Sequence, residues 1–157
     1  MLSTAHRILD GHSVTVHSPR KKTSWLLPDD RETTLYKATH ANHPSCIWTR
    51  QTVGNYQWLY QLFEALLAEY THRYGKIHGC AKLLPALAAP PAHIVSATFT
   101  EPPPAMPDSC KRGTVIASYQ EYYRTHKRSF ASWKHRPVPV FMSENTNHPD
   151  DNSIRVE

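Results

Sequence analysis

The densest run of side chains that could do chemistry is EYTHRYGKIH, at positions 69–78. It places a carboxylate, two imidazoles, a guanidinium and an amine within about two and a half helical turns. The residues spaced three, four or seven positions from the first, which can share one helix face, are Glu69, His72, Arg73 and Lys76. A carboxylate beside an amine favours proton transfer, or attack of the amine on a sugar carbon. The alternative is that the cations, His78 included, only complement the negative end of a helix.

A second polar run, WTRQTVGNYQW at positions 48–58, leads into the same stretch. Backbone N–H groups at a helix N-terminus can bind an anion, and Arg50 and Asn55 could assist in holding a phosphate. Trp48 and Trp58 are more typical of a core than of base stacking. We therefore expect Arg50, Asn55 and Arg73 to contact a phosphate-bearing substrate.

Metal and cofactor chemistry is poorly supported by the sequence. His40, His43 and Cys46 are three residues apart and could offer metal ligands, but no second ligand pair follows and Pro44 favours a turn. We predict no metal and no cofactor, with His43 capping a turn. The chain also has no Gly-rich phosphate loop and no GxSxG, CxxC or HExxH motif. These absences argue against an NTPase, a dinucleotide enzyme, a serine hydrolase and a zinc deaminase.

Two long helices must position these residues. The first is predicted at about 53–74, where Thr52 can cap the start and Gly75 can end the helix. Its apolar side chains recur every three or four positions: Tyr56, Leu59, Phe63, Leu66, Tyr70 and Tyr74. The second is predicted at about 114–134 and is stopped by Pro137 and Pro139. Its apolar stripe is Val115, Tyr119, Tyr122, His126, Phe130 and Trp133.

The rest of the chain is predicted to be less regular. A short helix of at most ten residues begins at Met1 and stops at Gly11. Residues 12–47 are interpreted as loop with a short helix near 32–37. Seven of the 13 prolines lie in 85–110, a long loop in which 94–99 could form a short edge strand. We predict a mainly α, single helical domain over 1–142 and a disordered acidic tail over 143–157.

The positive charge is concentrated in one place. The 157 residues contain 18 Lys and Arg against 13 Asp and Glu, a net charge of +5. Seven cations and Glu121 give 111–136 a charge of +6, so the remaining 131 residues sum to −1. Such a cluster is typical of polyanion binding, and we expect Arg124, Lys127 and Trp133 to contact nucleic acid. Tyr119 and Phe130 are expected to be core residues.

Three features bear on location. Cys46, Cys80 and Cys110 are odd in number and widely spaced, which favours a reducing compartment over a disulfide framework. The N-terminus has no basic region followed by an apolar one, so it is not a signal peptide. No stretch is long and apolar enough to span a membrane. These features indicate a small basic protein of the cytoplasm.

The motifs HP…WTR…NYQWL…EY…RYGK.H, followed by MP and YY…K..FA.W..R over roughly 2–141, resemble a family of small proteins of phages and their bacterial hosts. Their layout is similar to that of pyrimidine-dimer DNA glycosylases. The resemblance implies a mostly helical fold that acts on a base in DNA, with Lys76 as the amine nucleophile and Glu69 in proton transfer. It also implies a further segment upstream of Leu2, with Asp, Cys, His and Lys residues; a chain lacking it could bind DNA without turnover.

We therefore expect a DNA-binding protein of phage or prophage origin, in the cytoplasm of a bacterial host, that releases or modifies a base in single-stranded or duplex DNA. Glu69 and Lys76 are assigned as reacting residues, and His43 and His78 as supporting residues. One alternative is a non-catalytic nucleic-acid-binding accessory protein. Another is an interaction protein whose basic helix docks an acidic partner.

Overall fold

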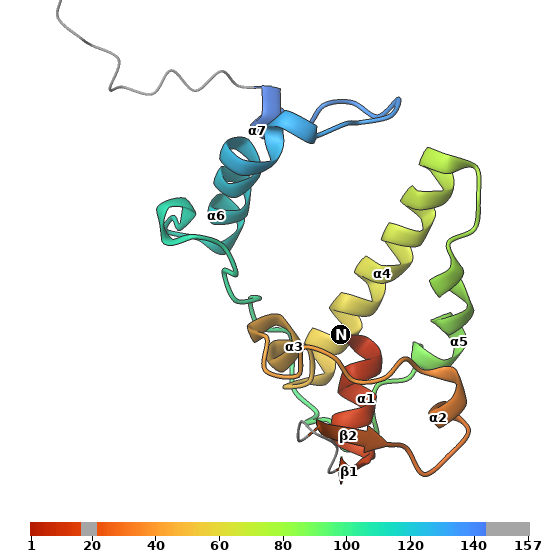
Figure 1. The fold of residues 1–157 in the computed structure, drawn as a ribbon. Helices are drawn as coiled ribbons and strands as arrows, with labels where there is room; N and C mark the ends of the chain where they lie inside the picture. Colours follow the sequence, from red (N-terminus) through yellow and green to blue (C-terminus); the bar gives the residue numbers. More distant parts are fainter. Residues whose placement is uncertain (17–21, 144–157) are drawn as a thin grey trace, which may run out of the picture. The chain divides into compact units, whose positions relative to one another are not determined.

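Figure 1 shows the computed structural model, which describes residues 1–16 and 22–143. The chain divides into two compact units, 1–105 and 106–157. This division differs from the predicted single domain over 1–142. The boundary falls in the run EPPPAMP at 101–107, where prolines provide no backbone donors for pairing with either unit. The predicted tail lies outside the described residues, except for Ser143.

The elements of the first unit are α1 (Leu2–Asp10), β1 (His12–Val16), β2 (Lys22–Leu26), α2 (Arg31–Thr34), α3 (Pro44–Thr49), α4 (Val53–Tyr74), a 3-10 helix (Gly79–Leu83) and α5 (Leu84–Leu87). Those of the second unit are a 3-10 helix (Asp108–Cys110), α6 (Val115–Tyr122), a π-helical turn (Tyr123–Lys127), a 3-10 turn (Arg128–Phe130) and α7 (Val140–Ser143). The predicted fold class, mainly α, is confirmed. No described helix combines the length and apolar character needed to cross a membrane.

The long helix α4 has the predicted bounds, and its two ends show why. The Thr52 hydroxyl accepts a hydrogen bond of 3.1 Å from the Asn55 N–H, as an N-cap does. Gly75 has φ +62°, a left-handed conformation that favours glycine, and its N–H donates to Thr71 O. The first half of α4 packs into the core through Tyr56 and Leu59, whereas Leu66 is 59% exposed.

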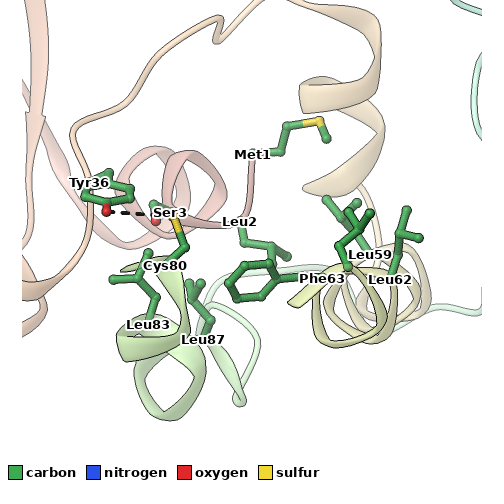
Figure 2. A pocket seen from close by; sticks show the side chains of 11 residues that line it. Met1, Leu2, Ser3, Tyr36, Leu59, Leu62, Phe63, Cys80, Leu83 and Leu87 are labelled. Carbon is green, nitrogen blue, oxygen red and sulfur yellow. Dashed lines mark hydrogen bonds between the residues drawn. The ribbon is translucent and has the colours of Figure 1, made fainter. Parts of the chain in front are cut away.

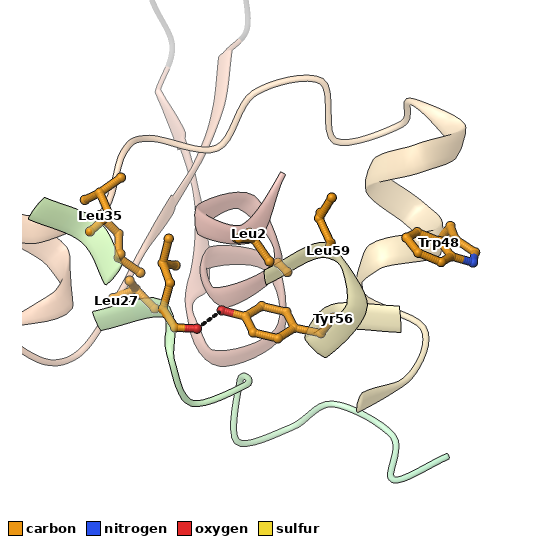
Figure 3. Close-up of a cluster of buried hydrophobic side chains, with 9 residues drawn as sticks. Leu2, Leu27, Leu35, Trp48, Tyr56 and Leu59 are labelled. Carbon is orange, nitrogen blue, oxygen red and sulfur yellow. Dashed lines mark hydrogen bonds between the residues drawn. The ribbon is translucent and has the colours of Figure 1, made fainter. Parts of the chain in front are cut away.

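The core of the first unit lies where α1, α4 and the segment 79–87 meet, as Figure 3 shows for part of the cluster. Its members are Leu2, Ala5, Leu27, Leu35, Trp48, Tyr56, Leu59, Leu83 and Leu87. Helix α5 is tied to α4 by two hydroxyls, because Tyr56 donates to Leu87 O at 2.9 Å and Tyr60 donates to Leu84 O at 3.3 Å. The N-terminal helix predicted from Met1 to Gly11 is α1, and it contributes to this core.

Two predictions for the first unit were wrong. Residues 12–47 are not a loop throughout, since β1 and β2 form an antiparallel hairpin in which His12 pairs with Leu26. The short helix in this region, α2, lies at 31–34. Residues 94–99 do not form a strand. Instead, Val95 O and Ala97 O accept hydrogen bonds from the N–H groups of Val53 and Gly54 in the first turn of α4, so this segment satisfies the start of a helix.

The second predicted helix starts where expected, because Thr114 caps α6 by accepting from the Ala117 N–H. The helical path continues through the π and 3-10 turns and ends at Phe130, four residues before the predicted end at 134. The described part of this unit buries few side chains: Cys110, Ser118 and Met142. Phe130 is 68% exposed, so its predicted core role was wrong; Tyr119 is half-buried.

Candidate functional site

The predicted reacting residues gather around the end of α4. Arg73 Nε donates to Glu69 Oε1 at 2.7 Å, an ion pair between residues one turn apart, and both side chains are about a quarter exposed. Lys76 is exposed and follows directly after the Gly75 cap. His78 caps the 3-10 helix Gly79–Leu83 by accepting from the Cys80 N–H at 3.1 Å. The arrangement at Glu69 is therefore a neutralised surface ion pair in the last two turns of α4, and the Lys76 amine follows the end of that helix.

His43 lies elsewhere. It is the exposed N-cap of α3, where Nδ1 accepts from the Ser45 N–H at 3.2 Å, as the predicted capping role requires. α3 precedes the start of α4, and α4 spans about 33 Å at 1.5 Å per residue. The structure therefore does not bring His43 together with Lys76. In the part of the chain described, no three His, Cys, Asp or Glu side chains are placed to hold a metal ion, and Cys46 is buried.

Asn55 cannot contact a nucleic acid in this structure, which corrects the sequence-based assignment. Its side chain is fully buried, and Nδ2 donates to Trp48 O and to Thr100 Oγ1, both at 3.0 Å. Its Oδ1 accepts from the Thr100 N–H at 2.8 Å. Asn55 thus joins α3, α4 and the segment 98–100. Arg50 is half-buried and donates to Ala41 O at 2.7 Å, which holds the loop before α3.

A buried polar network in the first unit was missed from the sequence. Arg31 Nη1 donates to His6 Nδ1 at 2.9 Å, and His6 Nε2 lies 2.7 Å from the Tyr56 hydroxyl. The same Arg31 nitrogen donates to Asp10 Oδ2 at 2.7 Å. Burial, together with the charge of Arg31, lowers the pKa of His6 to about 4. The signal in the sequence was the pair of polar residues His6 and Arg7 within the short helix predicted from Met1 to Gly11.

Asp10 is the anionic member of this network, and its side chain is 3% exposed. It accepts hydrogen bonds from Arg31, from the Ala92 N–H and from both the N–H and Nδ1 of His93, the last three at 3.1 Å. Burial opposes ionisation, but these hydrogen bonds prevail and lower the pKa of Asp10 to about 2. The carboxylate therefore stays charged and ties α1 to the segment 92–93.

Arg7 is a buried cation of α1 and is inaccessible to solvent. Its guanidinium donates to the backbone carbonyls of four residues and to the Glu32 carboxylate. The acceptor carbonyls are those of Trp25, Glu32, Leu35 and Tyr36. All of them lie in 25–36, so Arg7 organises this segment from the side of α1. Its role is structural and leaves no donor facing solvent.

An apolar pocket of about 230 Å³ opens beside the core of the first unit (Figure 2). The residues that line it are Met1, Leu2, Ser3, Tyr36, Leu59, Leu62, Phe63, Leu66, Cys80, Leu83 and Leu87. The Tyr36 hydroxyl lies 3.8 Å from the Cys80 sulfur, a contact that raises the pKa of this tyrosine. Such a lining fits apolar groups, and its side chains include no carboxylate, imidazole, ammonium or guanidinium.

In the second unit, part of the predicted basic surface is internally neutralised. Glu121 accepts from Arg112 at 2.8 Å and from Arg124 at 2.9 Å, and the hydrogen bond from Arg124 is the main cause of its lowered pKa. Lys111 pairs with Asp108 at 2.6 Å. Arg124 therefore has a carboxylate partner that a phosphate would have to share or replace.

Lys127 contacts rings instead. Its ammonium lies 5.0 Å from the centre of the Tyr122 ring and 5.4 Å from that of Phe130, distances typical of cation–π contacts. Arg128 is exposed and donates to Met142 O at 2.8 Å, which ties the helical segment to α7. Trp133 is half-buried. Three of the residues predicted to bind nucleic acid lie in the second unit: Arg124, Lys127 and Trp133. The others, Arg50, Asn55 and Arg73, lie in the first.

Comparison of the chain with known proteins gave no match among protein-family models, curated proteins or solved structures.

Proposed function

We propose that this protein binds DNA through the second unit. The observation that carries the proposal is charge: residues 106–143 contain seven Lys and Arg against two acids, Asp108 and Glu121. Both acids already pair with cations of the same unit. Lys127 and Arg128, whose described contacts are to rings and to a carbonyl, therefore add positive charge on the helical segment 115–130. A localised positive field of this kind supports binding to phosphates.

The test is fluorescence anisotropy with labelled single-stranded and duplex DNA at about 50 and 200 mM salt. If several phosphates are contacted, affinity should fall by about tenfold or more between these concentrations. The double substitution Lys127→Gln and Arg128→Gln should weaken binding to both DNAs and make the salt dependence less steep. Lys82→Gln is the control for loss of one positive charge outside the second unit, because Lys82 is an exposed lysine of the first unit.

The contrary result is binding no tighter than that of a basic protein of equal charge. It would remove the DNA proposal and favour the alternative, in which the basic segment docks an acidic protein. Pull-down on an acidic peptide resin, with the same pair of variants, would then identify the class of partner. Unchanged DNA affinity in the Lys127 and Arg128 variant would also contradict the proposal, because the second unit would not be the binding surface.

Processing of a base is a separate part of the proposal. It is supported by the resemblance to pyrimidine-dimer DNA glycosylases and by the positions of Glu69, Lys76 and His78 around the end of α4. In the proposed reaction the Lys76 amine bonds to C1′ of the sugar, and the base leaves with the bonding electron pair. Glu69 then carries a proton from this nitrogen to O4′ as the C1′–O4′ bond breaks, which opens the sugar ring and leaves the imine. His78 is assigned a supporting role and Arg73 a substrate-contact role, whereas His43, at the N-cap of α3, takes no part in this reaction. We place the reaction in the cytoplasm of a bacterial host of a phage or prophage.

The amine mechanism predicts a covalent intermediate. Incubation with ultraviolet-irradiated DNA and borohydride, which reduces the imine between the amine and C1′, should yield a stable protein–DNA adduct. Lys76→Ala should abolish the adduct, and Glu69→Gln should slow its formation, whereas Lys82→Ala should not change it. Absence of both adduct and released base would contradict base processing and leave DNA binding to be judged by the anisotropy experiment alone.

A further inference from the structure

We propose that the second unit binds unpaired bases of single-stranded DNA, by stacking them on the rings of Phe130 and Tyr123. The inference rests on the proposed DNA binding and specifies the form of DNA. It is drawn from the arrangement of aromatic and cationic side chains along residues 122–130, called here the aromatic–cation ladder.

Two rings of the ladder face solvent although they are large, while that of Tyr122 is half-buried. Phe130 is 68% and Tyr123 45% exposed. Neither is needed to fill a core, because the buried side chains of the described part of this unit are Cys110, Ser118 and Met142. An exposed aromatic ring beside a cation is the combination by which single-strand-binding proteins hold a base and its phosphate.

The members of the ladder are in sequential contact. The rings of Tyr123 and Tyr122 meet edge to face with their centres 6.4 Å apart. The Lys127 ammonium then links Tyr122 to Phe130, at 5.0 and 5.4 Å from the two ring centres. His126 lies against Tyr122 at 5.3 Å with its ring tilted by 37°. These contacts restrict the rings, so less side-chain entropy is lost when a base stacks on them.

Tyr123 and Phe130 lie seven residues apart on one path of π and 3-10 turns, so a single strand that follows this path meets both rings. Lys127, between the two rings in sequence, is placed to meet a phosphate of the same stretch.

An unpaired strand fits this surface better than a duplex does. Bases within a duplex are already stacked on their neighbours and present only their edges in the grooves. A single strand exposes the faces of its bases, and every base has such a face, so the site would accept many sequences. The positive charge alone would hold either form of DNA, whereas the exposed rings add affinity for the single strand.

The experiment compares three labelled ligands: a 15-nucleotide strand, a strand of equal phosphate number in which the central nucleotides are abasic, and a duplex of the same length, which carries twice as many phosphates. With the wild-type chain at one salt concentration, the intact strand should bind about 5- to 100-fold more tightly than the abasic strand, the range expected for stacking of one base. It should also bind more tightly than the duplex. These comparisons require no substituted protein.

Variants then assign the effect to the ladder. Phe130→Leu and Tyr123→Leu should weaken binding of the intact strand by about fivefold or more each, while abasic-strand and duplex binding change by less than twofold. Ile116→Ala is the matched control, because Ile116 is an equally exposed apolar residue of the same unit. Circular dichroism compares the helix content of each variant with that of the wild type.

Two results would overturn the inference in distinguishable ways. If the abasic strand or the duplex binds as tightly as the intact strand, or if the leucine variants bind the intact strand normally, then contact is through phosphates; the stacking inference fails while DNA binding stands. If this protein binds none of the three ligands more tightly than a basic protein of equal charge does, both the inference and the proposed function fail.

Discussion

The guanidinium of Arg31 donates a 2.9 Å hydrogen bond to Nδ1 of His6, and this contact fixes the protonation of a buried imidazole. A guanidinium can only donate, so Nδ1 must accept. The Tyr56 hydroxyl uses its proton on Leu87 O, so Nε2 of His6 donates to Tyr56. His6 is therefore neutral with its proton on Nε2. A second proton, on Nδ1, would be repelled by the positive charge of Arg31. This repulsion agrees in direction with the lowered pKa of His6.

The neutral His6 predicts a pH-dependent stability. Its pKa is about 4 in the folded state and about 6.5 when unfolded, so the unfolded chain takes up a proton first as the pH falls. The contribution is complete above about pH 6.5 and is lost progressively between pH 6.5 and 4. The free energy of unfolding should decrease by about 2–3 kcal/mol from pH 7 to 4.5 through this residue, measured by urea unfolding with tryptophan fluorescence.

His6→Gln removes the titrating group and should flatten this part of the pH profile. His12→Gln is the control, because His12 is exposed on β1 and the profile should keep its shape. An NMR titration of His6 in the wild-type chain provides a check without substitution. A midpoint near 6.5 in the folded protein would contradict the arrangement around Arg31. Asp10, with a pKa of about 2 in the folded state and 3.8 as a free group, acts at lower pH.

Arg7→Met should destabilise the first unit strongly. The substitution keeps much of the side-chain length but removes the donors that four backbone carbonyls and Glu32 use. Leaving buried acceptors without donors should lower the free energy of unfolding by roughly 3–5 kcal/mol. Arg73→Met is the matched control. Its surface ion pair with Glu69 should be worth less than about 1 kcal/mol, so equal losses in the two variants would contradict the structural role of Arg7.

Gly54→Ala should loosen the contact between α4 and the segment 95–100. A Cβ at Gly54 would lie 2.3 Å from the Phe99 backbone nitrogen, so the two backbones would have to separate. We expect a loss of about 1–3 kcal/mol in unfolding free energy. The same change at Gly79 meets open space and should be nearly neutral. A neutral Gly54→Ala would show that this close approach is absent in solution.

Cys80 should be the fast-reacting thiol. It is half-buried at the pocket beside Tyr36, while Cys46 and Cys110 are buried. In the folded chain a thiol reagent such as dithionitrobenzoate should modify one sulfur rapidly and the others on unfolding, as followed by absorbance and located by mass spectrometry. Cys80→Ser should remove the fast phase. A fast phase of two thiols would contradict the burial of the other two.

The helices could be predicted from the sequence where local signals agree. α4 has a capping Thr52, a terminal Gly75 and a regular apolar repeat, and each signal acts within a few residues. The hairpin of β1 and β2 depends on pairing between residues up to 14 positions apart. The carbonyls of Val95 and Ala97 are used by the first turn of α4, and no local propensity indicates that pairing.

The candidate site was less predictable, because burial decides what a polar residue can do. Asn55 was placed correctly at the start of a helix, but its contacts with Thr100 require a segment 45 residues away. Phe130 occupies a core-like position in the helical pattern, yet its side chain is 68% exposed among the described residues of the second unit. The roles of His6 and Arg7 follow from the segments that fold around α1, which single-sequence periodicity does not report.

Arg7 serves the segment 25–36 much as a bound calcium ion serves a loop, gathering carbonyl oxygens around one positive centre. The centre here is covalently part of α1, 18 to 29 residues earlier in the chain. It cannot be removed by a chelator or diluted away. The folded conformation of 25–36 therefore depends on α1. If α1 unfolds or detaches, this segment between β2 and α3 loses its shared hydrogen-bond donor.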